Sequence, residues 1–553
     1  MAVNVLRDSL LDALRDIPGT RDFHLHLLVS APRKTNGLYP FAHPRPRAYL
    51  QDILILASEQ ATPDAPRLIV TAIEANVYVV PATSCAVLYV SKVDSSGQGA
   101  RPSPTSRLVQ RLVKYYADPV TRPVKALHLW VHLFARAQNQ YLLPNSVEFE
   151  GKKPLSDIKL CAWWKRVLGD AYKDVEGAKD LTRRAWYILP GFNELEALNA
   201  LGATRTEADP WVYGHPYEQT DIPLPCPRDE HHLGHFIPSF EDDPKSRFVD
   251  DIAYTTEGEI KSPIKKRQRT ESTTDGSHKP TSRAGKPASH AAKPPSTAPS
   301  LAPKPSIESL NAKEDKDKAA SEDPTARELR KVSPAEFWER MSFRQECVSG
   351  AITGFFVLAF SCPASALPPD DGVSPLAPLP GHVAPRVVKR VITSLMTAVE
   401  FSTRERAVHA TSSIESTIQG LCDGLVPASA PTSRVGAPKP RAPLLLQVPG
   451  EEHAEGSKST DTSASTDAPT GSERPSTPPP HLFEPPSTPP RRKTALPDPS
   501  PNPFEEPVAT MDTYHQHIYG SVSVKNPEPV KQAPTAAQPV TVLAVRKKKK
   551  KAT

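Results

Sequence analysis

Two β-rich runs decide the fold class of this chain, Ile69-Val70-Thr71-Ala72-Ile73 and Val77-Tyr78-Val79-Val80. β-branched and aromatic side chains favour extended backbone, so both runs indicate strands. A third apolar run, from Cys85 to Val90, indicates another strand, and the polar residues from Ser91 to Gly97 indicate a turn after it. Strands so close together along the chain predict a β-sheet at the centre of the fold.

Helical and extended patterns continue on both sides of these runs. Apolar residues at helical spacing predict helices over residues 3–16, 106–117, 156–172, 386–399 and 404–421. Further strands are expected over residues 23–30, 127–134 and 351–361. Ser333-Pro334-Ala335-Glu336 has the composition of a capping box, which predicts a helix that runs to about Cys347. The patterns favour an α/β (α+β) fold.

The 63 prolines of the 553 residues are concentrated in two stretches that contain few apolar side chains. One stretch covers residues 258–330 and the other covers residues 426–553. Neither can bury enough apolar surface to offset the entropy cost of ordering its backbone, so both are expected to be disordered. Helix and strand patterns resume after residue 330. We therefore expect one domain over residues 1–425 with 258–330 as a disordered insertion, followed by a disordered tail.

The charges are unevenly distributed, although the formal net charge is only +6. One basic cluster lies within residues 261–269, and a second runs from Arg546 to Lys551. Such runs are typical of nuclear import signals and of contacts with acidic partners, so we expect a nuclear protein; the alternative is a solvated tail.

Cysteine usage and hydropathy narrow the class of protein further. The six cysteines form no CxxC pair, which suits free thiols in a reducing compartment. No apolar run reaches the roughly 18 residues of a membrane span, so we expect no membrane partner. The spacing of Cys226, His231, His232 and His235 fits no zinc pattern, so we expect no metal site.

The heptapeptide Asp242-Asp243-Pro244-Lys245-Ser246-Arg247-Phe248 contains one carboxylate more than a helix start needs. Asp is a preferred N-cap and proline is favoured at the first helical position. The second carboxylate is therefore available to attract a cation, whereas Lys245, on this pattern alone, is an exposed helix lysine. Trp163 and Trp164 face different directions on one helix, so either both are core residues or one of them lines a pocket.

Four blocks of the sequence carry a family resemblance: Leu88 to Gly97, Leu133 to Ser146, the pair Trp163-Trp164, and the heptapeptide from Asp242. Together they resemble the fungal histone H3 lysine-56 acetyltransferase family, which is distantly similar in fold to the CBP-type acetyltransferases of animals. The helix from Ser333 and the segment Thr541-Val542-Leu543 also match the family. The resemblance covers about residues 1–257, 330–425 and the last dozen. It implies a CBP-type histone acetyltransferase fold, with a central mixed β-sheet surrounded by helices.

The resemblance implies an enzyme that transfers acetyl from acetyl-CoA to histone H3, with lysine 56 as the expected target and N-terminal tail lysines as further targets. The implied partners are histones H3–H4, together with nucleosome-assembly-type and anti-silencing-type histone chaperones that stimulate transfer. The implied setting is replication-coupled nucleosome assembly and the DNA damage response in the nucleus. Direct sequence-specific binding of nucleic acid is not expected.

The resemblance also implies roles for individual residues. The catalytic candidates are Asp94, Tyr141, Trp164, Asp242 and Asp243. A free lysine has a pKa near 10.4, so the carboxylates would orient the amine or accept its proton, and the aromatic faces would hold its stem. Lys245 matches the family's autoacetylated lysine. The residues implied to bind the cofactor are Val93, Asp94, Ser95, Arg101, Phe134, Arg136, Gln138, Lys153, Pro154, Leu155 and Trp163.

Two other functions stay open at this point. The first is a non-catalytic chromatin or histone-binding scaffold, whose sequence would show damaged acids or aromatics at the site. The second is a basic nucleic-acid-binding protein, which rests only on the basic runs of the two disordered stretches.

Overall fold

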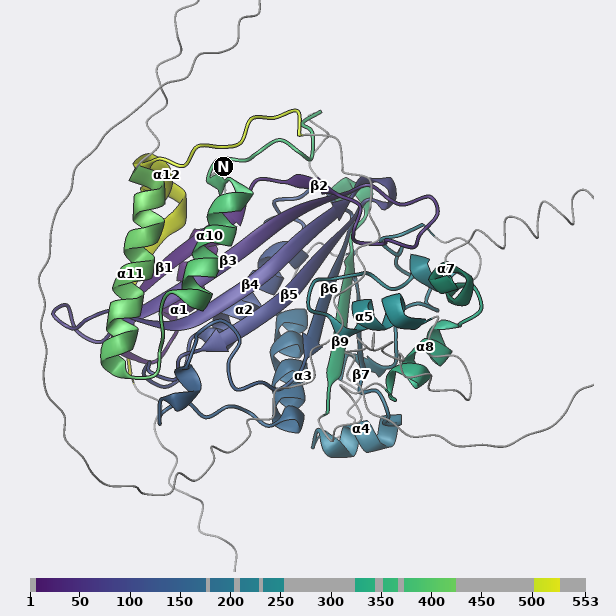
Figure 1. Ribbon diagram of the computed structural model, residues 1–553, viewed down its shortest axis with the longest axis horizontal. Coiled ribbons are helices and arrows are strands. Elements are labelled where there is room, and N and C mark those ends of the chain that lie inside the picture. Colours follow the sequence, from purple (N-terminus) through teal and green to yellow (C-terminus); the bar gives the residue numbers. More distant parts are fainter. Residues whose placement is uncertain are drawn as a thin grey trace, which may run out of the picture. The chain divides into compact units, whose positions relative to one another are not determined.

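The computed structural model describes residues 6–175, 180–202, 209–227, 232–252, 324–343, 352–366, 372–423 and 502–527 (Figure 1). Their strands are β1 (Gly19–Ser30), β2 (Arg33–Thr35), β3 (Ala48–Gln60), β4 (Leu68–Val80), β5 (Cys85–Ser95), β6 (His128–Ala135), β7 (Thr182–Ile188), β8 (Trp211–Tyr213), β9 (Gly354–Ser361), β10 (His382–Val383) and β11 (Tyr519–Asn526). All of them belong to one sheet, in the order β10-β1-β3-β4-β5-β6-β9-β7-β8, with β11 paired to β1 and β2 paired to β3. The β5–β6, β7–β8 and β1–β10 pairs are parallel and the other pairs are antiparallel, so the predicted mixed sheet is confirmed.

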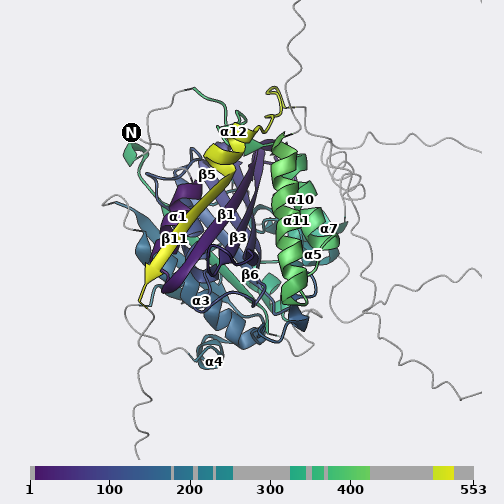
Figure 2. The same cartoon turned by 90° about the vertical axis from the view of Figure 1, so that its left-hand side faces the viewer.

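Helices cover both faces of this sheet. One face packs against α1 (Leu6–Arg15), α2 (Thr105–Ala117) and α3 (Asp157–Asp174), with α4 (Glu194–Ala200) at its margin. The other face packs against α10 (Pro385–Thr397) and α11 (Arg404–Asp423) at one end. At its other end it packs against α5 (Pro244–Asp251), α7 (Pro324–Leu329) and α8 (Pro334–Met341). Figure 2 shows α10 and α11 on one side of the sheet and α1 and α3 on the other.

Alternation along the strands explains why both faces bury apolar surface. In β5, Ala86, Leu88 and Val90 face the helices α1–α3, whereas Val87 and Tyr89 face the opposite side. In β3, Ile53 and Ile55 face α1–α3, whereas Leu54 and Leu56 pack under α10 and α11. Successive side chains of a strand point to opposite faces, so a sheet covered on both sides needs apolar residues in continuous runs.

The structure corrects the predicted turn from Ser91 to Gly97. β5 continues to Ser95, because Lys92 and Asp94 pair in register with β4. The ammonium of Lys92 lies 2.9 Å from a carboxylate oxygen of Glu74 on that strand. Polar residues that suggested a turn therefore extend the strand through a cross-strand ion pair. The strands β2, β3, β7, β8 and β10 were not foreseen. The helix α8 ends at Met341 rather than at Cys347, which lies outside the described residues.

Two ordered segments lie within stretches that were predicted to be disordered. The helix α7 occupies Pro324–Leu329, and residues 502–527 contain α12 (Met511–Thr513), a π-helical turn (Tyr514–Ile518) and β11. Tyr514 and Ile518 are buried in the cluster beneath α10 and α11, so local apolar content orders a segment whose surroundings are proline-rich. The remainder of 258–330 and 426–553 lies outside the described residues, as do both basic clusters and Thr541-Val542-Leu543.

Two further observations concern the described residues alone. Cys85, Cys161, Cys226, Cys362 and Cys422 are buried free thiols. No helix in this part of the chain combines the length and the apolar character needed to cross a membrane.

Candidate functional site

A cavity of about 880 Å³ lies where β5 and β6 end and where α2 and α3 begin. Every residue that the resemblance implied for the cofactor lines it, namely Val93, Asp94, Ser95, Arg101, Phe134, Arg136, Gln138, Lys153, Pro154, Leu155 and Trp163. Tyr141 and Trp164 line it too. Small-molecule sites have volumes of roughly 300–1,000 Å³, so the cavity can hold a cofactor. We refer to it below as the large cavity.

The wall of the large cavity is strongly basic. Lys92, Arg101, Arg136, Lys152 and Lys153 line it, whereas its acidic lining consists of Asp94. Among the described residues, no carboxylate forms an ion pair with Arg101, Arg136 or Lys153. Thr105 and Ser106, at the N-terminus of α2, also line the cavity, and a helix N-terminus favours negative charge. The wall therefore suits a ligand that carries phosphate groups.

Asp94 anchors the turn that brings Tyr141 to the cavity. Its Oδ2 accepts the backbone N–H groups of residues 141–143 at 2.8, 2.9 and 3.0 Å. Its Oδ1 accepts the Ser95 N–H and the Lys152 ammonium, each at 2.8 Å. The side chain of Asp94 is only 4% exposed. With both oxygens occupied and its side chain buried, Asp94 is placed to position the wall of the cavity.

The aromatic candidates also lie at the large cavity. The rings of Trp163 and Trp164 meet edge to face, with their centroids 4.7 Å apart. Trp164, a residue of α3, is buried in the core and also lines the cavity, so it is both a core residue and a pocket residue. The hydroxyl of Tyr141 donates a hydrogen bond to the backbone carbonyl of Arg136. Burial raises the pKa of Tyr141 to about 12, so at neutral pH its hydroxyl is a donor and not a base.

The two carboxylates of the heptapeptide are separated by the structure. Asp243 caps α5 by accepting the Lys245 N–H at 2.8 Å, and its other oxygen pairs with the Lys245 ammonium. The side chains of Asp243 and Lys245 are 0% and 5% exposed. Lys245 is therefore not an exposed helix lysine, and the carboxylate that solvent reaches is that of Asp242.

Asp242 connects the heptapeptide to the large cavity. Its backbone is left-handed, with φ of 65°, and its side chain is 56% exposed. Its Oδ2 lies 3.1 Å from the ammonium of Lys92, which lines the cavity and also pairs with Glu74. Neither Asp242 nor Asp243 is among the residues that line the large cavity. The acidic heptapeptide thus meets the basic wall through Lys92, for which no site role was predicted.

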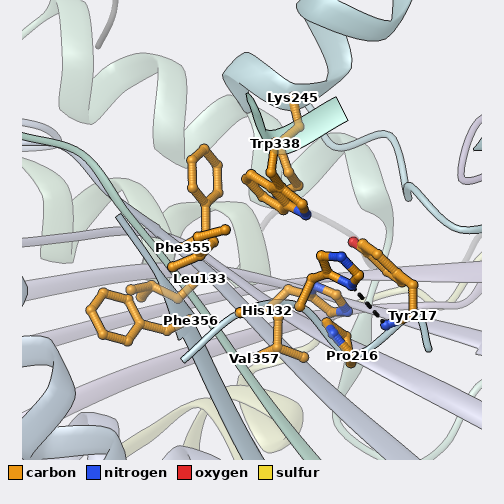
Figure 3. Close-up of a pocket in the computed structure, with 12 residues that line it drawn as sticks. His132, Leu133, Pro216, Tyr217, Lys245, Trp338, Phe355, Phe356 and Val357 are labelled. Carbon is orange, nitrogen blue, oxygen red and sulfur yellow. Dashed lines mark hydrogen bonds between the residues drawn. The ribbon is translucent and has the colours of Figure 1, made fainter. Parts of the chain in front are cut away.

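A second, small cavity of about 10 Å³ lies beside Lys245 (Figure 3). His132, Tyr217, Lys245 and Trp338 surround it, and the Lys245 ammonium lies 4.7 Å from the ring centroid of Phe355. Burial lowers the pKa of His132 to about 3, and the nearby Lys245 charge acts in the same direction, so the imidazole is neutral at pH 7. The volume of this small cavity admits one water molecule and no cofactor. Sequence patterns had not identified His132, because an isolated histidine in an apolar strand carries no site signal.

The cysteine and histidine cluster near residue 230 is held by ordinary hydrogen bonds. His235 Nδ1 lies 2.7 Å from the Pro227 carbonyl, and His235 Nε2 accepts the His43 N–H at 3.1 Å. Cys226 Sγ lies 3.6 Å from the same Nδ1. Within the described ranges, which omit His231, no group of His, Cys, Asp or Glu side chains has the arrangement of a metal site.

Comparison with known proteins identifies similar sequences and similar structures. The family model of the histone acetyltransferase KAT11-type domain matches residues 106–417. A protein named histone acetyltransferase rtt109 from Aspergillus flavus is 28% identical over 330 residues, which are 54% of this chain and 46% of that protein. Its namesake from Schizosaccharomyces pombe is 28% identical over 176 residues, which are 30% of this chain and 42% of that protein. The chain thus matches less than half the length of each relative.

The crystal structure of Rtt109 from Aspergillus fumigatus shares the fold described above. It matches with a TM-score of 0.50 at 22% sequence identity, and the match covers 74% of this chain and 96% of that chain. The fold predicted from the four sequence blocks is confirmed by this similarity.

Proposed function

Because the chain belongs to the KAT11-type histone acetyltransferase family, we propose that it is a lysine acetyltransferase that uses acetyl-CoA and modifies histone H3. The observation that carries this proposal is the large cavity. It has the volume of a cofactor site, a basic wall, and all the residues that the resemblance implied for the cofactor. A surface that served only to hold histones would need no basic cavity of this volume.

The wall of the cavity fits acetyl-CoA by its chemistry. Arg101, Arg136 and Lys153 would bind phosphate groups, together with the N-terminus of α2. Pro154, Leu155 and Trp163 would supply the apolar surface for the uncharged arm. When bound, acetyl-CoA supplies a thioester as the acyl donor. Asp94 would keep this wall in place, because it fastens the 141–143 turn and Lys152 to the end of β5.

The substrate amine must lose a proton before it can react. Removing it from a free lysine at pH 7 costs roughly 4–5 kcal/mol, at 1.36 kcal/mol per pKa unit. Asp242 is the candidate that solvent reaches, so it would orient the ammonium and accept its proton. Asp243 would contribute indirectly, by holding Lys245 and capping α5. Tyr141 and Trp164 would flank the alkyl stem of the substrate lysine.

The finer substrate and partner assignments follow from the resemblance. We expect lysine 56 of histone H3 as the main target, presented with histone H4 by nucleosome-assembly-type and anti-silencing-type chaperones in the nucleus. N-terminal tail lysines of H3 are the second expected targets. Both relatives are named histone acetyltransferase rtt109, which supports a histone substrate.

Lys245 is the autoacetylated residue that the resemblance implies. Acetylation would remove its charge and leave the buried Asp243 without a counter-ion. Because Lys245 is only 5% exposed, its modification requires α5 to move, so acetyl-CoA should modify it more slowly than it modifies histone lysines. Mass spectrometry of the full chain over a time course with acetyl-CoA measures this order.

Acetyl transfer to H3–H4 tests the proposal. The full chain, labelled acetyl-CoA and H3–H4 are incubated with and without each chaperone, and mass spectrometry locates the acetylated lysines. Asp242→Asn should lower the rate by about 10²-fold, the smaller of the usual effects of losing a general base. Asp12→Asn, on the exposed face of α1, is the matched control and should leave the rate unchanged. Retained histone binding without any transfer would indicate a non-catalytic scaffold.

A further inference from the structure

A buried ion pair outside the large cavity fastens the loop that forms one rim of it. The loop covers residues 98–104 and leads directly into α2. Gly99, Ala100, Arg101, Pro102 and Ser103 all line the cavity. Arg21 on β1 and Glu59 on β3 lie behind the loop and are not among the lining residues.

The contacts of this pair converge on two residues of the loop. The Arg21 guanidinium donates to Glu59 at 3.1 Å, to the Ala100 carbonyl at 2.8 Å and to the Pro102 carbonyl at 2.9 Å. Glu59 accepts the Ala100 N–H at 2.9 Å through its other oxygen. The side chains of Arg21 and Glu59 are 2% and 6% exposed. Both backbone polar groups of Ala100 are therefore bound to the ion pair.

Gly99 shows how closely the loop is held against the sheet. A Cβ atom at this position would lie 2.7 Å from Val70 Cγ1 and 2.8 Å from Glu59 Oε2. Neither distance is compatible with a side chain, so the backbone at Gly99 lies directly on β3 and β4. Arg21 also donates to the Pro18 carbonyl at 3.1 Å, which ties the loop to the start of β1.

The Arg21–Glu59 pair holds two parts of the cavity wall in place, the Arg101 cation and the N-terminus of α2. Arg101 lies between the two residues whose carbonyls Arg21 binds, and the N-terminus of α2 begins directly after the loop. From this geometry we propose that Arg21 and Glu59 are positioning residues that set the affinity for coenzyme A without affecting histone binding. The assignment rests on the proposed function, because it presumes that the large cavity binds the cofactor. A planar guanidinium can reach both carbonyls and the carboxylate in one plane, which a lysine ammonium cannot do.

A charge-free double variant tests the proposal on the full chain. Removing one partner would leave a buried charge unpaired and threaten folding, whereas Arg21→Met/Glu59→Gln removes both charges together. Calorimetric titration with coenzyme A should show a dissociation constant raised by about 10-fold, the lower end of the effect of losing outer partners that orient binding groups. Amide hydrogen exchange over residues 96–104 should become faster in the same variant. In turnover with H3–H4, the KM for acetyl-CoA should rise while the KM for histone stays unchanged.

A second ion pair provides the matched control. Arg33 and Asp52 join β2 and β3 through two hydrogen bonds of 2.6 and 2.9 Å, and neither lines the large cavity. Arg33→Met/Asp52→Asn should leave the affinity for coenzyme A and the exchange over 96–104 at wild-type values. Wild-type exchange over 96–104 in the Arg21→Met/Glu59→Gln variant would overturn the proposal, as would wild-type affinity for coenzyme A. If the wild-type chain binds no coenzyme A, the proposed function fails, and the exchange measurement still decides whether the pair holds the loop.

Discussion

The large cavity and the small cavity share Leu133 in their walls but differ in how their charges are arranged. The large cavity is lined by basic side chains, and Arg101, Arg136 and Lys153 have no carboxylate partner among the described residues. The small cavity borders a buried ion pair, in which Asp243 and Lys245 satisfy each other. The difference shows that the proposed cofactor wall is available to a ligand, whereas half of the acidic heptapeptide is committed to the fold. Asp242 is the half that solvent reaches, because its side chain is 56% exposed although it also pairs with Lys92.

The largest expected effect is a difference in stability between variants of the neighbouring carboxylates Asp242 and Asp243. Asp243→Ala leaves the buried Lys245 ammonium without its partner, so the free energy of unfolding should fall by about 3–5 kcal/mol. Asp242→Ala removes a half-exposed ion pair and should cost at most about 1 kcal/mol. Urea denaturation of both variants gives the comparison. Equal losses of stability would show that the two carboxylates are not divided between the fold and the site.

The wall of the large cavity should also depend on a buried carboxylate, that of Asp94. Asp94→Asn weakens charge-assisted hydrogen bonds to the 141–143 turn and leaves Lys152 without an anion, so unfolding should be easier by about 1.5–3 kcal/mol. The affinity for coenzyme A should fall as well, since the turn and Lys152 form part of the wall. Denaturation and calorimetric titration on the same sample measure the two effects. A variant with normal stability but no acetyl transfer would instead make Asp94 a catalytic base.

The small cavity should make stability depend on pH through His132. Its pKa is about 3 in the folded chain and near 6.5 when unfolded, so below pH 6.5 the unfolded state binds the proton and stability falls. For this group alone, the loss between pH 7 and pH 5 amounts to about 2 kcal/mol. His132→Phe should reduce the decrease that urea denaturation measures between these two pH values. His409→Asn, on the exposed face of α11, is the control. An unchanged pH dependence in His132→Phe would show that other groups, such as the buried His26, account for it.

The smallest effect concerns the single cations of the large cavity. Arg136→Ala and Lys153→Ala should each weaken coenzyme A binding by about tenfold, which corresponds to 1.4 kcal/mol. The dependence of affinity on salt should also become less steep, because one fewer cation faces the phosphate groups. Arg386→Ala, on the exposed face of α10, should change neither quantity. Equal weakening by Arg386→Ala would point to a general effect of net charge instead of a local site.

Much of the fold was predictable, because the segments with continuous or periodic apolar patterns form the strands and helices that those patterns predict. β3 was missed although Ile53, Leu54, Ile55 and Leu56 form such a run, so its signal was available in the sequence. β11 was missed for a different reason. Val522 and Val524 alternate with polar residues over a short segment, and averaging over the proline-rich tail conceals that pattern.

The resemblance named residues that line the large cavity, but it did not distinguish Asp242 from Asp243, neither of which lines it. That distinction depends on the left-handed backbone of Asp242 and on the cap of α5, which turn adjacent side chains to different surroundings. The roles of Lys92 and of the Arg21–Glu59 pair depend on strand register, which places Glu74 opposite Lys92 and β3 beside β1. Residues far apart in the sequence carry no local signal of such pairing.

A crystal structure of the full chain in complex with acetyl-CoA tests the central claim most directly. We predict that the phosphate groups lie against Arg101, Arg136, Lys153 and the N-terminus of α2, and that the acetyl end lies on the side of Asp242, Tyr141 and Trp164. A cofactor bound outside the large cavity, or an acetyl end remote from Asp242, would contradict it.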